Sequence, residues 1–365
     1  MVITPPRSGS LQDIAHRVEA GERLSFEDGV RLFESDDLLA IGRMADLVRR
    51  RKHGDVAYFN INRRLEPTNA CVARCSFCSF YRPLSHPEAY TLSLEEIAAF
   101  ARSTSPETTE VHIVGGLNPK LPFSYFTDLL RTLRREAPHL HLKAFTAVEI
   151  VWFAEHYGMT IEQVLRELRE AGLQSLPGGG AEIFAPRVRR LICDHKTDAE
   201  GWLEVHRTAH RLGLRSNATM LYGHIESYED RVDHLLRLRE LQDETGGFQA
   251  FIGLPFLPQH NLLGRGREFT GGADDLKVLA VARLLLDNFD HIKAYWVMVG
   301  LKLAQVALSF GVDDLDGTIV KETIAHNAGA DSPDEVSAQY LADVIREAGR
   351  RPVERDTLYN VVREW

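Results

Sequence analysis

The sequence predicts an α/β protein that folds as a TIM-like (β/α)8 barrel, with extra helices at its N- and C-terminal ends. Short strand-like apolar runs alternate with longer amphipathic runs over most of the chain. Strands that alternate with helices are joined by right-handed crossovers and form a parallel sheet. Seven or eight such units over about 260 residues match the usual size of this barrel. A doubly wound open sheet is the alternative, but no GxGxxG turn follows the first strand.

Helices are expected first, over residues 10–52. Leu11, Ile14 and Val18 recur at helical spacing, and the stretch DDLLAIGRMADLVRRRKHG ends in basic residues and Gly54, as the C-terminus of a helix does. The strand and helix units follow. Strands are expected at 61–69, 110–116, 139–147, 173–180, 215–223, 249–258, 291–300 and, as the eighth, 313–320.

Each expected strand precedes helical sequence. The helices begin near Ser93 and then in FSYFTDLLRTLRREA, IEQVLRELREAG, GWLEVHRTAHRLG, YEDRVDHLLRLRELQDETGG, DDLKVLAVARLLLDNF and LKLAQVALSFG. The stretches SAQYLADVIREAGR and TLYNVVREW are expected to form helices behind the barrel. No low-complexity linker divides the chain, so we predict one domain over 1–365, with helices at 1–56, the barrel at 57–320 and helices at 321–365.

The composition of the chain limits the classes of partner that it can bind. Its 365 residues are 44% hydrophobic and carry a formal net charge of −9, which argues against nucleic acid or an anionic membrane as the main partner. No apolar run approaches the roughly 20 residues of a membrane span. The N-terminal stretch MVITPPRSGSLQDIAHRVEAGERL lacks the apolar core and cleavage site of a signal peptide, so we expect a cytoplasmic protein.

Three of the four cysteines lie together in CVARCSFC. Cys71, Cys75 and Cys78 have the spacing CxxxCxxC directly after the first expected strand, on a loop at the barrel face where active sites are built. Three thiolates can hold three irons of a 4Fe–4S cluster and leave the fourth iron open. An open coordination position is a binding site, as in catalytic zinc centres.

Two other interpretations of this stretch stay open. Ordinary buried thiols are one, although Arg74 and Ser76 between the cysteines argue against a closely packed core run. A structural zinc site is the other, with Cys193 or His86 as its fourth ligand. Cys193 itself, in RRLICDHK, follows a helical apolar pattern and is predicted to be a small core residue.

The cysteine motif, with Phe77 between its last two cysteines, resembles that of the radical S-adenosylmethionine (SAM) superfamily. The resemblance implies that the open iron binds the amino and carboxylate groups of SAM, and that one-electron reduction cleaves SAM to methionine and a 5′-deoxyadenosyl radical. It also implies that Phe77 lies near the adenine, that Gly115 and Gly116 of HIVGGLNP line the methionine end, and that Glu182 of LPGGGAEIF contacts the ribose or amino acid part. Without the resemblance, these stretches are a plain turn and a loop whose carboxylate lies near a helix N-terminus.

Polar residues late in the barrel are further candidates. In SNATMLYGHIE, Asn217 and Thr219 are expected to face into the barrel, and Asn217 is predicted to contact the cofactor. His224, just past the strand, is predicted to protonate or orient a substrate, although such a histidine can equally pair with a neighbour. Arg82 is the second predicted catalytic residue. Cationic groups that suit substrate carboxylates are Arg82, His112, Lys143, His224 and Lys293, several of which are expected to form plain salt bridges.

From about residue 60 to 330 the chain resembles the radical SAM enzymes of the futalosine route to menaquinone. The stretches LEPTNACVARCSFCSFYR, EVHIVGGLNPKLPFSYF, LKAFTAVEI, SLPGGGAEIF, SNATMLYGHIE, RELQDETGGFQAFI, HIKAYW and DDLDGTI carry the resemblance. AFTAVEI, HIKAYW and DDLDGT favour the aminofutalosine synthase branch over the dehypoxanthine futalosine cyclase branch. FIGLPFLPQHN (251–261) departs from the synthase pattern, with Leu257 where a histidine is expected.

The synthase resemblance implies that the adenosyl radical adds to the enol ether of 3-[(1-carboxyvinyl)oxy]benzoate, giving 6-amino-6-deoxyfutalosine and bicarbonate. It implies a 4Fe–4S cluster, SAM and a flavodoxin- or ferredoxin-type reductant. The cyclase alternative would instead release 5′-deoxyadenosine. A third alternative is a non-enzymatic iron–sulfur or zinc protein, but an electron carrier normally encloses its cluster with four ligands.

Overall fold

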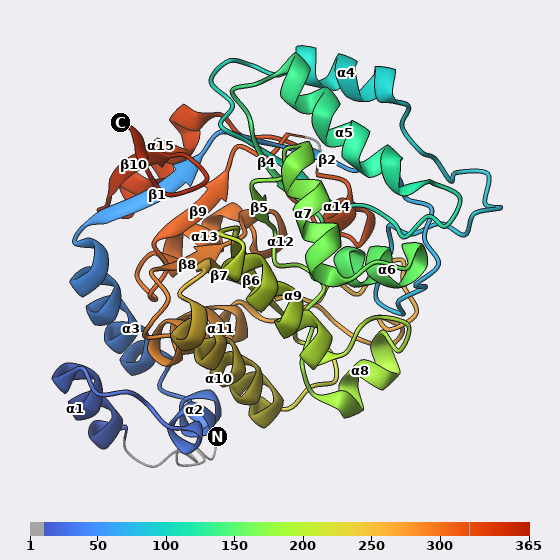
Figure 1. Ribbon diagram of the computed structural model, residues 1–365. Coiled ribbons are helices and arrows are strands. Elements are labelled where there is room, and N and C mark those ends of the chain that lie inside the picture. Colours follow the sequence, from blue (N-terminus) through green and yellow to red (C-terminus); the bar gives the residue numbers. More distant parts are fainter. Residues whose placement is uncertain (1–10, 321) are drawn as a thin grey trace.

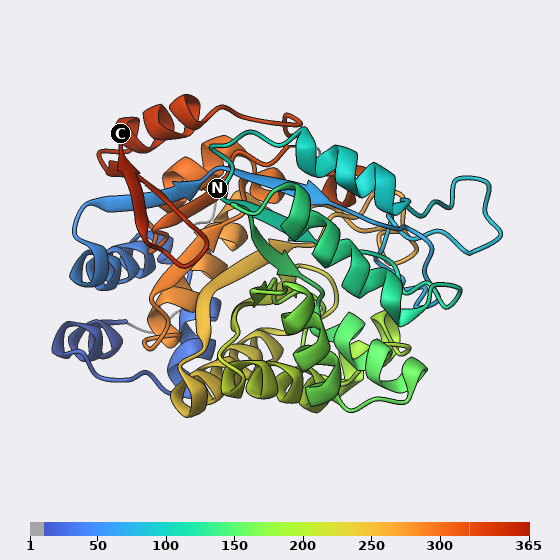
Figure 2. The same cartoon turned by 45° about the horizontal axis from the view of Figure 1, so that its top comes forward.

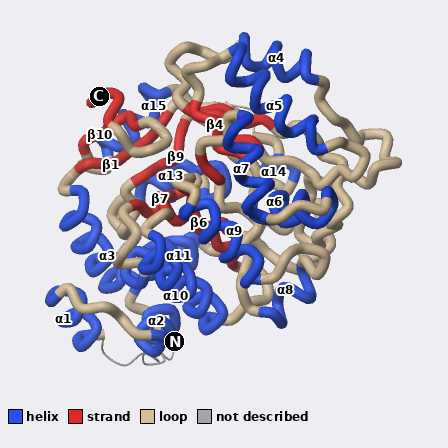
Figure 3. The backbone as a smooth tube through the Cα atoms, in the orientation of Figure 1, coloured by secondary structure: helices blue, strands red, loops and turns tan. Residues whose placement is uncertain are grey.

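The computed structural model describes residues 11–320 and 322–365. The strands form the centre of the molecule and helices surround them (Figures 1 and 3). Within the described residues the sheet has the order β11-β10-β1-β9-β8-β7-β6-β5-β4-β3-β2. The strands are β1 Val56–Asn60, β2 Asn62–Leu65, β3 Glu110–Ile113, β4 His141–Ala144, β5 Ser175–Leu176, β6 Arg215–Tyr222, β7 Phe248–Pro255, β8 His291–Ala294, β9 Asp314–Gly317, β10 Arg351–Arg355 and β11 Val361–Glu364.

The segment 56–65 closes the barrel, because its two halves pair with opposite ends of the sheet. β1 runs parallel to β9, with Tyr58 opposite Asp314, and β2 runs parallel to β3, with Asn62 opposite Glu110. The strands between β3 and β9 are parallel to their neighbours. The predicted TIM-like barrel is therefore confirmed, with β9 as its eighth strand.

Helices cover the outside of the barrel (Figure 2). Three precede it: α1 Gln12–Ala20, α2 Phe26–Glu34 and α3 Leu38–His53. The helices that follow are α4 Leu94–Arg102, α5 Phe123–Glu136, α6 Ala147–Tyr157, α7 Ile161–Ala171, α8 Pro186–Ile192, α9 Ala199–Arg211, α10 Tyr228–Thr245, α11 Gly272–Leu285, α12 Trp296–Val299, α13 Leu301–Ala307, α14 Ile324–Asn327 and α15 Ala338–Glu347. The N-terminal helices agree with the sequence prediction from residue 11 onward; residues 1–10 of the predicted N-terminal segment lie outside the described part.

Several sequence predictions about the elements are wrong. The strand expected at 291–300 ends at Ala294, and the helix α12 follows it. The stretch TLYNVVREW is not a helix: after a turn it forms β11, antiparallel to β10. Asp356 stabilises that turn by accepting hydrogen bonds from the backbone N–H groups of Leu358 and Asn360, and the β-branched pair Val361 and Val362 favours a strand. The strand expected at 139–147 ends at Ala144, and the extra helix α6 follows it.

Thr146 explains where α6 begins. Its hydroxyl accepts a hydrogen bond from the Glu149 backbone N–H, while Glu149 accepts one from the Thr146 backbone N–H at 2.7 Å, which is a capping box. Because this cap starts a helix directly after β4, the strand ends at the C-terminal face of the barrel.

Ion pairs fill the interior of the barrel. Lys143 on β4 donates to Glu110 on β3 at 2.6 Å, and Lys293 on β8 donates to Asp316 on β9 at 3.1 Å. Burial by itself would raise the pKa of Glu110, but Lys143 and Lys293 lower it well below its usual value. The two lysines predicted as possible carboxylate ligands are thus occupied by salt bridges inside the protein.

Replacing Lys143 with methionine is expected to destabilise the fold strongly. It leaves the Glu110 carboxylate buried and unpaired with that lysine, a change that costs about 3–5 kcal/mol in comparable buried pairs. Urea unfolding of the parent, Lys143→Met and the double variant Lys143→Met/Glu110→Leu measures the effect. The double variant should recover most of the loss, and a single variant as stable as the parent would contradict the expectation.

Candidate functional site

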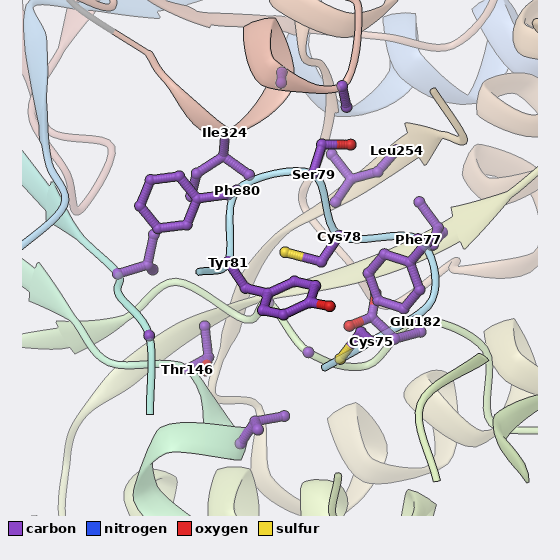
Figure 4. Close-up of a pocket in the computed structure, with 18 of the residues that line it drawn as sticks. Cys75, Phe77, Cys78, Ser79, Phe80, Tyr81, Thr146, Glu182, Leu254 and Ile324 are labelled. Atoms are coloured by element: carbon purple, nitrogen blue, oxygen red, sulfur yellow. The ribbon is translucent and has the colours of Figure 1, made fainter. Parts of the chain in front are cut away.

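A cavity of about 330 Å³ opens at the C-terminal ends of the barrel strands. Its lining comes from the segment after β2, from the loops after β3, β4 and β5, and from the ends of β6 to β9. Figure 4 shows that Cys75, Phe77 and Glu182 lie at one part of this cavity and that Leu254 and Ile324 form part of an apolar wall. In barrels of this kind the active site lies at this face.

The cysteine loop, residues 66–93 between β2 and α4, is held in place by backbone bonds. The Cys71 N–H donates to the Arg82 carbonyl at 3.0 Å, and the Arg82 N–H donates to the Asn69 carbonyl at 2.8 Å. The Ser76 N–H donates to the carbonyl of Ile192 at the end of α8, also at 3.0 Å. The loop is therefore fixed at both its base and its tip.

Cys71, Cys75 and Cys78 all line the cavity. Burial raises the pKa of Cys75 to about 12, so as a free thiol it is neutral, and binding iron must displace its proton. The Ala73 backbone N–H lies 3.4 Å from Cys71 Sγ, an arrangement that stabilises a thiolate. Cys193 is buried and, in the part of the chain the structure describes, does not line the cavity. Three thiols in one cavity fit a cluster with an open iron.

Gly115 and Gly116 follow β3 and line the same cavity. Neither has a positive φ, so the backbone angles do not require glycine at these two positions. The close approach is real, since a Cβ on Gly116 would lie 2.3 Å from the Ala70 carbonyl oxygen and 3.0 Å from Cys71 Cβ. Gly116 therefore makes room for the cysteine loop itself, and a bulky side chain at this position would displace that loop.

Glu182 forms an ion pair inside the cavity. Lys196 donates to its carboxylate at 2.6 Å, and the Lys196 ammonium also lies over the Phe77 ring, 5.0 Å from its centroid. Burial would lower the pKa of Lys196, but Cys75 and Glu182 raise it well above its usual value. A charged pair beside the cysteines suits the zwitterionic amino acid part of SAM, and sequence reasoning missed the lysine.

Of the polar pair on β6, Thr219 lines the cavity and Asn217 does not, within the described residues. The Thr219 hydroxyl donates to the Gly178 carbonyl at 2.9 Å. The Asn217 backbone comes so close to Gly178 that a Cβ there would lie 2.0 Å from the Asn217 oxygen. The predicted contact of Asn217 with the cofactor stays a prediction that this geometry does not support.

The two residues predicted to be catalytic lie outside the cavity lining of the described chain. Arg82 donates to the carbonyls of Ser79 at 2.9 Å and Tyr81 at 3.1 Å and pairs with Glu88, so its guanidinium holds the cysteine loop together. The His224 side chain is fully buried, and its Nδ1 lies 3.0 Å from the Glu226 carboxylate. Their catalytic roles stay predictions, and the geometry gives each a structural task.

Sequence reasoning missed several cavity residues: Arg64, Glu66, Tyr295 and Glu322. The structure shows why Arg64 faces inward: alternate residues of a strand share one face, and Asn62, two positions earlier, is buried. Of the cations predicted to suit a carboxylate, only His112 lines the cavity in the part of the chain described.

A barrel with three cysteines on its first loop is the architecture of the radical SAM superfamily, and the chain belongs to it. The model for the radical SAM superfamily matches residues 65–238, and the one described as the CofH/MqnC C-terminal region matches residues 245–365. The crystal structure of methylornithine synthase (PylB) has the same fold, with a TM-score of 0.74 at 18% identity over 93% of this chain and 97% of that one.

Curated relatives are similar over nearly the whole chain. The aminodeoxyfutalosine synthase of Thermus thermophilus is 51% identical over 98% of this chain and 98% of its own. That of Streptomyces coelicolor is 48% identical over 98% of this chain and 95% of its own. A cyclic dehypoxanthine futalosine synthase from Halalkalibacterium halodurans is 37% identical over 98% of this chain and 96% of its own. None of the helices described has the length and apolar character needed to cross a membrane.

Proposed function

We propose that this protein catalyses the aminodeoxyfutalosine synthase reaction of menaquinone biosynthesis. SAM, 3-[(1-carboxyvinyl)oxy]benzoate and water give 6-amino-6-deoxyfutalosine, methionine and bicarbonate. The observation that carries the proposal is the opening of Cys71, Cys75 and Cys78 into one cavity with an apolar wall, in a chain 51% identical to such a synthase.

The three cysteines would hold a 4Fe–4S cluster with an open iron, as the superfamily implies. The chemistry that such a cluster would supply, when bound and reduced, is the one-electron cleavage of SAM to methionine and a 5′-deoxyadenosyl radical. The Glu182–Lys196 pair and Phe77, which line the cavity with the cysteines, would bind and orient SAM. The overall reaction is redox-neutral, so it would consume no electron per turnover beyond the one that starts it. A flavodoxin- or ferredoxin-type protein would supply that electron in the cytoplasm.

The substrate's alkene must lie close to the 5′ carbon of SAM before the reaction starts. Addition needs the two carbons at a near-attack distance of roughly 3–3.5 Å. The cavity extends from the cysteine loop to the ends of β7 and β8, and Leu254 and Met298 on its wall can pack against an aromatic ring. This wall includes part of the segment that departs from the synthase pattern, since Leu257 also lines the cavity.

Anaerobic turnover with adenosine-labelled SAM, dithionite and the enol-ether benzoate tests the proposal. The label is expected in a product that also contains the benzoate, with one bicarbonate released per turnover. The cyclase is the second candidate, favoured by the 37% identical relative, and it would leave the label in free 5′-deoxyadenosine. Stoichiometric 5′-deoxyadenosine without an adduct would rule out the synthase. Absence of iron and sulfide after anaerobic reconstitution would rule out both.

A further inference from the structure

A group of polar side chains deep in the cavity has unused hydrogen-bonding capacity. Arg64 on β2, Glu66 just after it, His112 on β3 and Tyr295 just after β8 all line the cavity. Buried polar groups are normally paired within the protein, so several unpaired groups in one place indicate a polar ligand.

Arg64 is the centre of this group. Its side chain is only 9% exposed, and its one ion-pair partner among the described residues is Asp316, at 3.3 Å. Lys293 already binds the same carboxylate at 3.1 Å and lies 4.0 Å from Asp314. Of the Arg64 nitrogens, only Nη2 donates to another described residue, so a further terminal N–H of the guanidinium remains for a ligand at the cavity wall. A planar guanidinium with free N–H groups suits a carboxylate ligand.

The neighbours of Arg64 add further donors. Its guanidinium carbon lies 5.2 Å from the centroid of the Tyr295 ring, and His112 stands opposite Arg64 in the register of β2 and β3. Neither the Tyr295 hydroxyl nor the His112 ring makes a hydrogen bond to another described residue. Burial and the nearby cations lower the pKa of His112 well below its usual value, so the neutral ring keeps one N–H to donate.

Two acids, Glu66 and Glu322, line the cavity near Arg64, and neither forms an ion pair with it among the described residues. Burial raises the pKa of Glu66 to about 8, with a further contribution from Glu322, so Glu66 is uncharged at neutral pH and can donate a hydrogen bond. Glu322 accepts hydrogen bonds from the backbone N–H groups of Ile324 and Ala325, at 3.2 and 2.8 Å. Within the described residues it forms no ion pair with Arg64.

The depth of the group indicates which part of a ligand it receives. Arg64 and His112 lie within strands, whereas the cysteines, Gly116 and Glu182 lie on loops beyond the strand ends. A substrate whose alkene reaches SAM at the loops therefore points its opposite end into the barrel. In the enol-ether benzoate, that end is the carboxylate on the ring.

We propose that Arg64, assisted by the Tyr295 hydroxyl and His112, binds the ring carboxylate of the aryl substrate and so sets the specificity of the cavity for a meta-carboxylated ring. The proposal rests on the proposed function for the identity of the substrate. The carboxylate site itself is inferred from the polar groups of Arg64, Tyr295 and His112 at the cavity wall, and a binding measurement tests this site without turnover.

Equilibrium binding by calorimetry, with SAM present and no reductant, tests the site on the cluster-loaded protein. Arg64→Gln is expected to weaken binding of 3-[(1-carboxyvinyl)oxy]benzoate by about 10- to 100-fold, the range for a lost charge-assisted hydrogen bond. Tyr295→Phe, which removes one hydroxyl, should weaken it by about 3- to 10-fold. The analogue 2-phenoxyacrylate lacks the ring carboxylate, and the parent and Arg64→Gln should bind it equally.

Arg63 provides the matched control. It is the adjacent residue of the same strand but faces the opposite way, donating to Ser103 and Thr104 beside the Phe100 ring. Arg63→Gln should bind both ligands as the parent does. The cluster absorbance of each variant shows whether it has folded and loaded.

The outcomes separate the site from the reaction. Equal weakening of both ligands in Arg64→Gln, or no weakening of the dicarboxylate in either variant, would overturn the carboxylate site. If Arg64→Gln failed to fold, the Tyr295→Phe comparison of the two ligands would decide. If the parent formed no adduct yet bound the dicarboxylate through Arg64, the proposed function would fail and the site would stand. If the parent formed the adduct but binding of the dicarboxylate did not depend on Arg64, the proposed function would stand and the carboxylate site would fail.

Discussion

Replacing Cys71, Cys75 or Cys78 with alanine is expected to abolish both the visible absorbance of the cluster and all adduct formation. Each of the three thiols lines the cavity, and a three-cysteine cluster has no spare protein ligand to replace one that is lost. The measurements are iron and sulfide content after anaerobic reconstitution, the absorbance spectrum, and product mass after turnover.

Cys193→Ala is the control for this prediction. Cys193 is buried in the core at the end of α8, where an alanine removes one small group, and we expect the cluster and activity to remain. Cys193 is a demanding control because the cysteine loop is hydrogen-bonded to Ile192, the residue next to it, so the substitution is made close to the cluster loop. Loss of the cluster in Cys193→Ala, or its survival in Cys75→Ala, would overturn the assignment of ligands.

Gly116→Val is expected to reduce cluster content and to lower activity by roughly two orders of magnitude or more, since a misplacement of about 1 Å in a reacting group can cost that much. The added Cβ would meet the backbone of Ala70 at 2.3 Å, and backbone cannot rotate away as a flexible side chain can. The cysteine loop must shift at Cys71. Iron content measures the loss of the cluster, a binding assay measures the loss of SAM affinity, and turnover measures the loss of activity.

Gly179→Ala is the matched control, because Gly179 also lines the cavity but its Cβ would approach only the Thr146 methyl group, at 3.1 Å. This variant should keep its cluster. If Gly116→Val kept a full cluster and lost only SAM binding, the packing argument would be wrong.

Much of the architecture could be predicted from the chain. Alternating strand and helix periods indicate a parallel barrel, and the interval between cysteines places three thiols on its first loop. The C-terminal strand β11 could not be recognised in the same way, because TLYNVVREW has helix-compatible spacing and only pairing with β10 makes it a strand. Arg82 and His224 show the same limit, since a polar residue near a strand end can turn either into the cavity or into its own loop.

The sequence by itself determined the barrel and the cysteine motif, because these depend on local periodicity and on spacing within one short segment; the reaction class followed from the resemblance to the radical SAM family. Only the tertiary structure decided which polar groups are free for a ligand. Lys143, Lys293 and Arg64 are all cationic residues of barrel strands, yet the two lysines are occupied by Glu110 and Asp316, whereas Arg64 bonds to Asp316 through one terminal nitrogen and lines the cavity with the rest of its guanidinium. Partners come from strands far apart in the chain, and a charge is available to a substrate only where no such partner satisfies it.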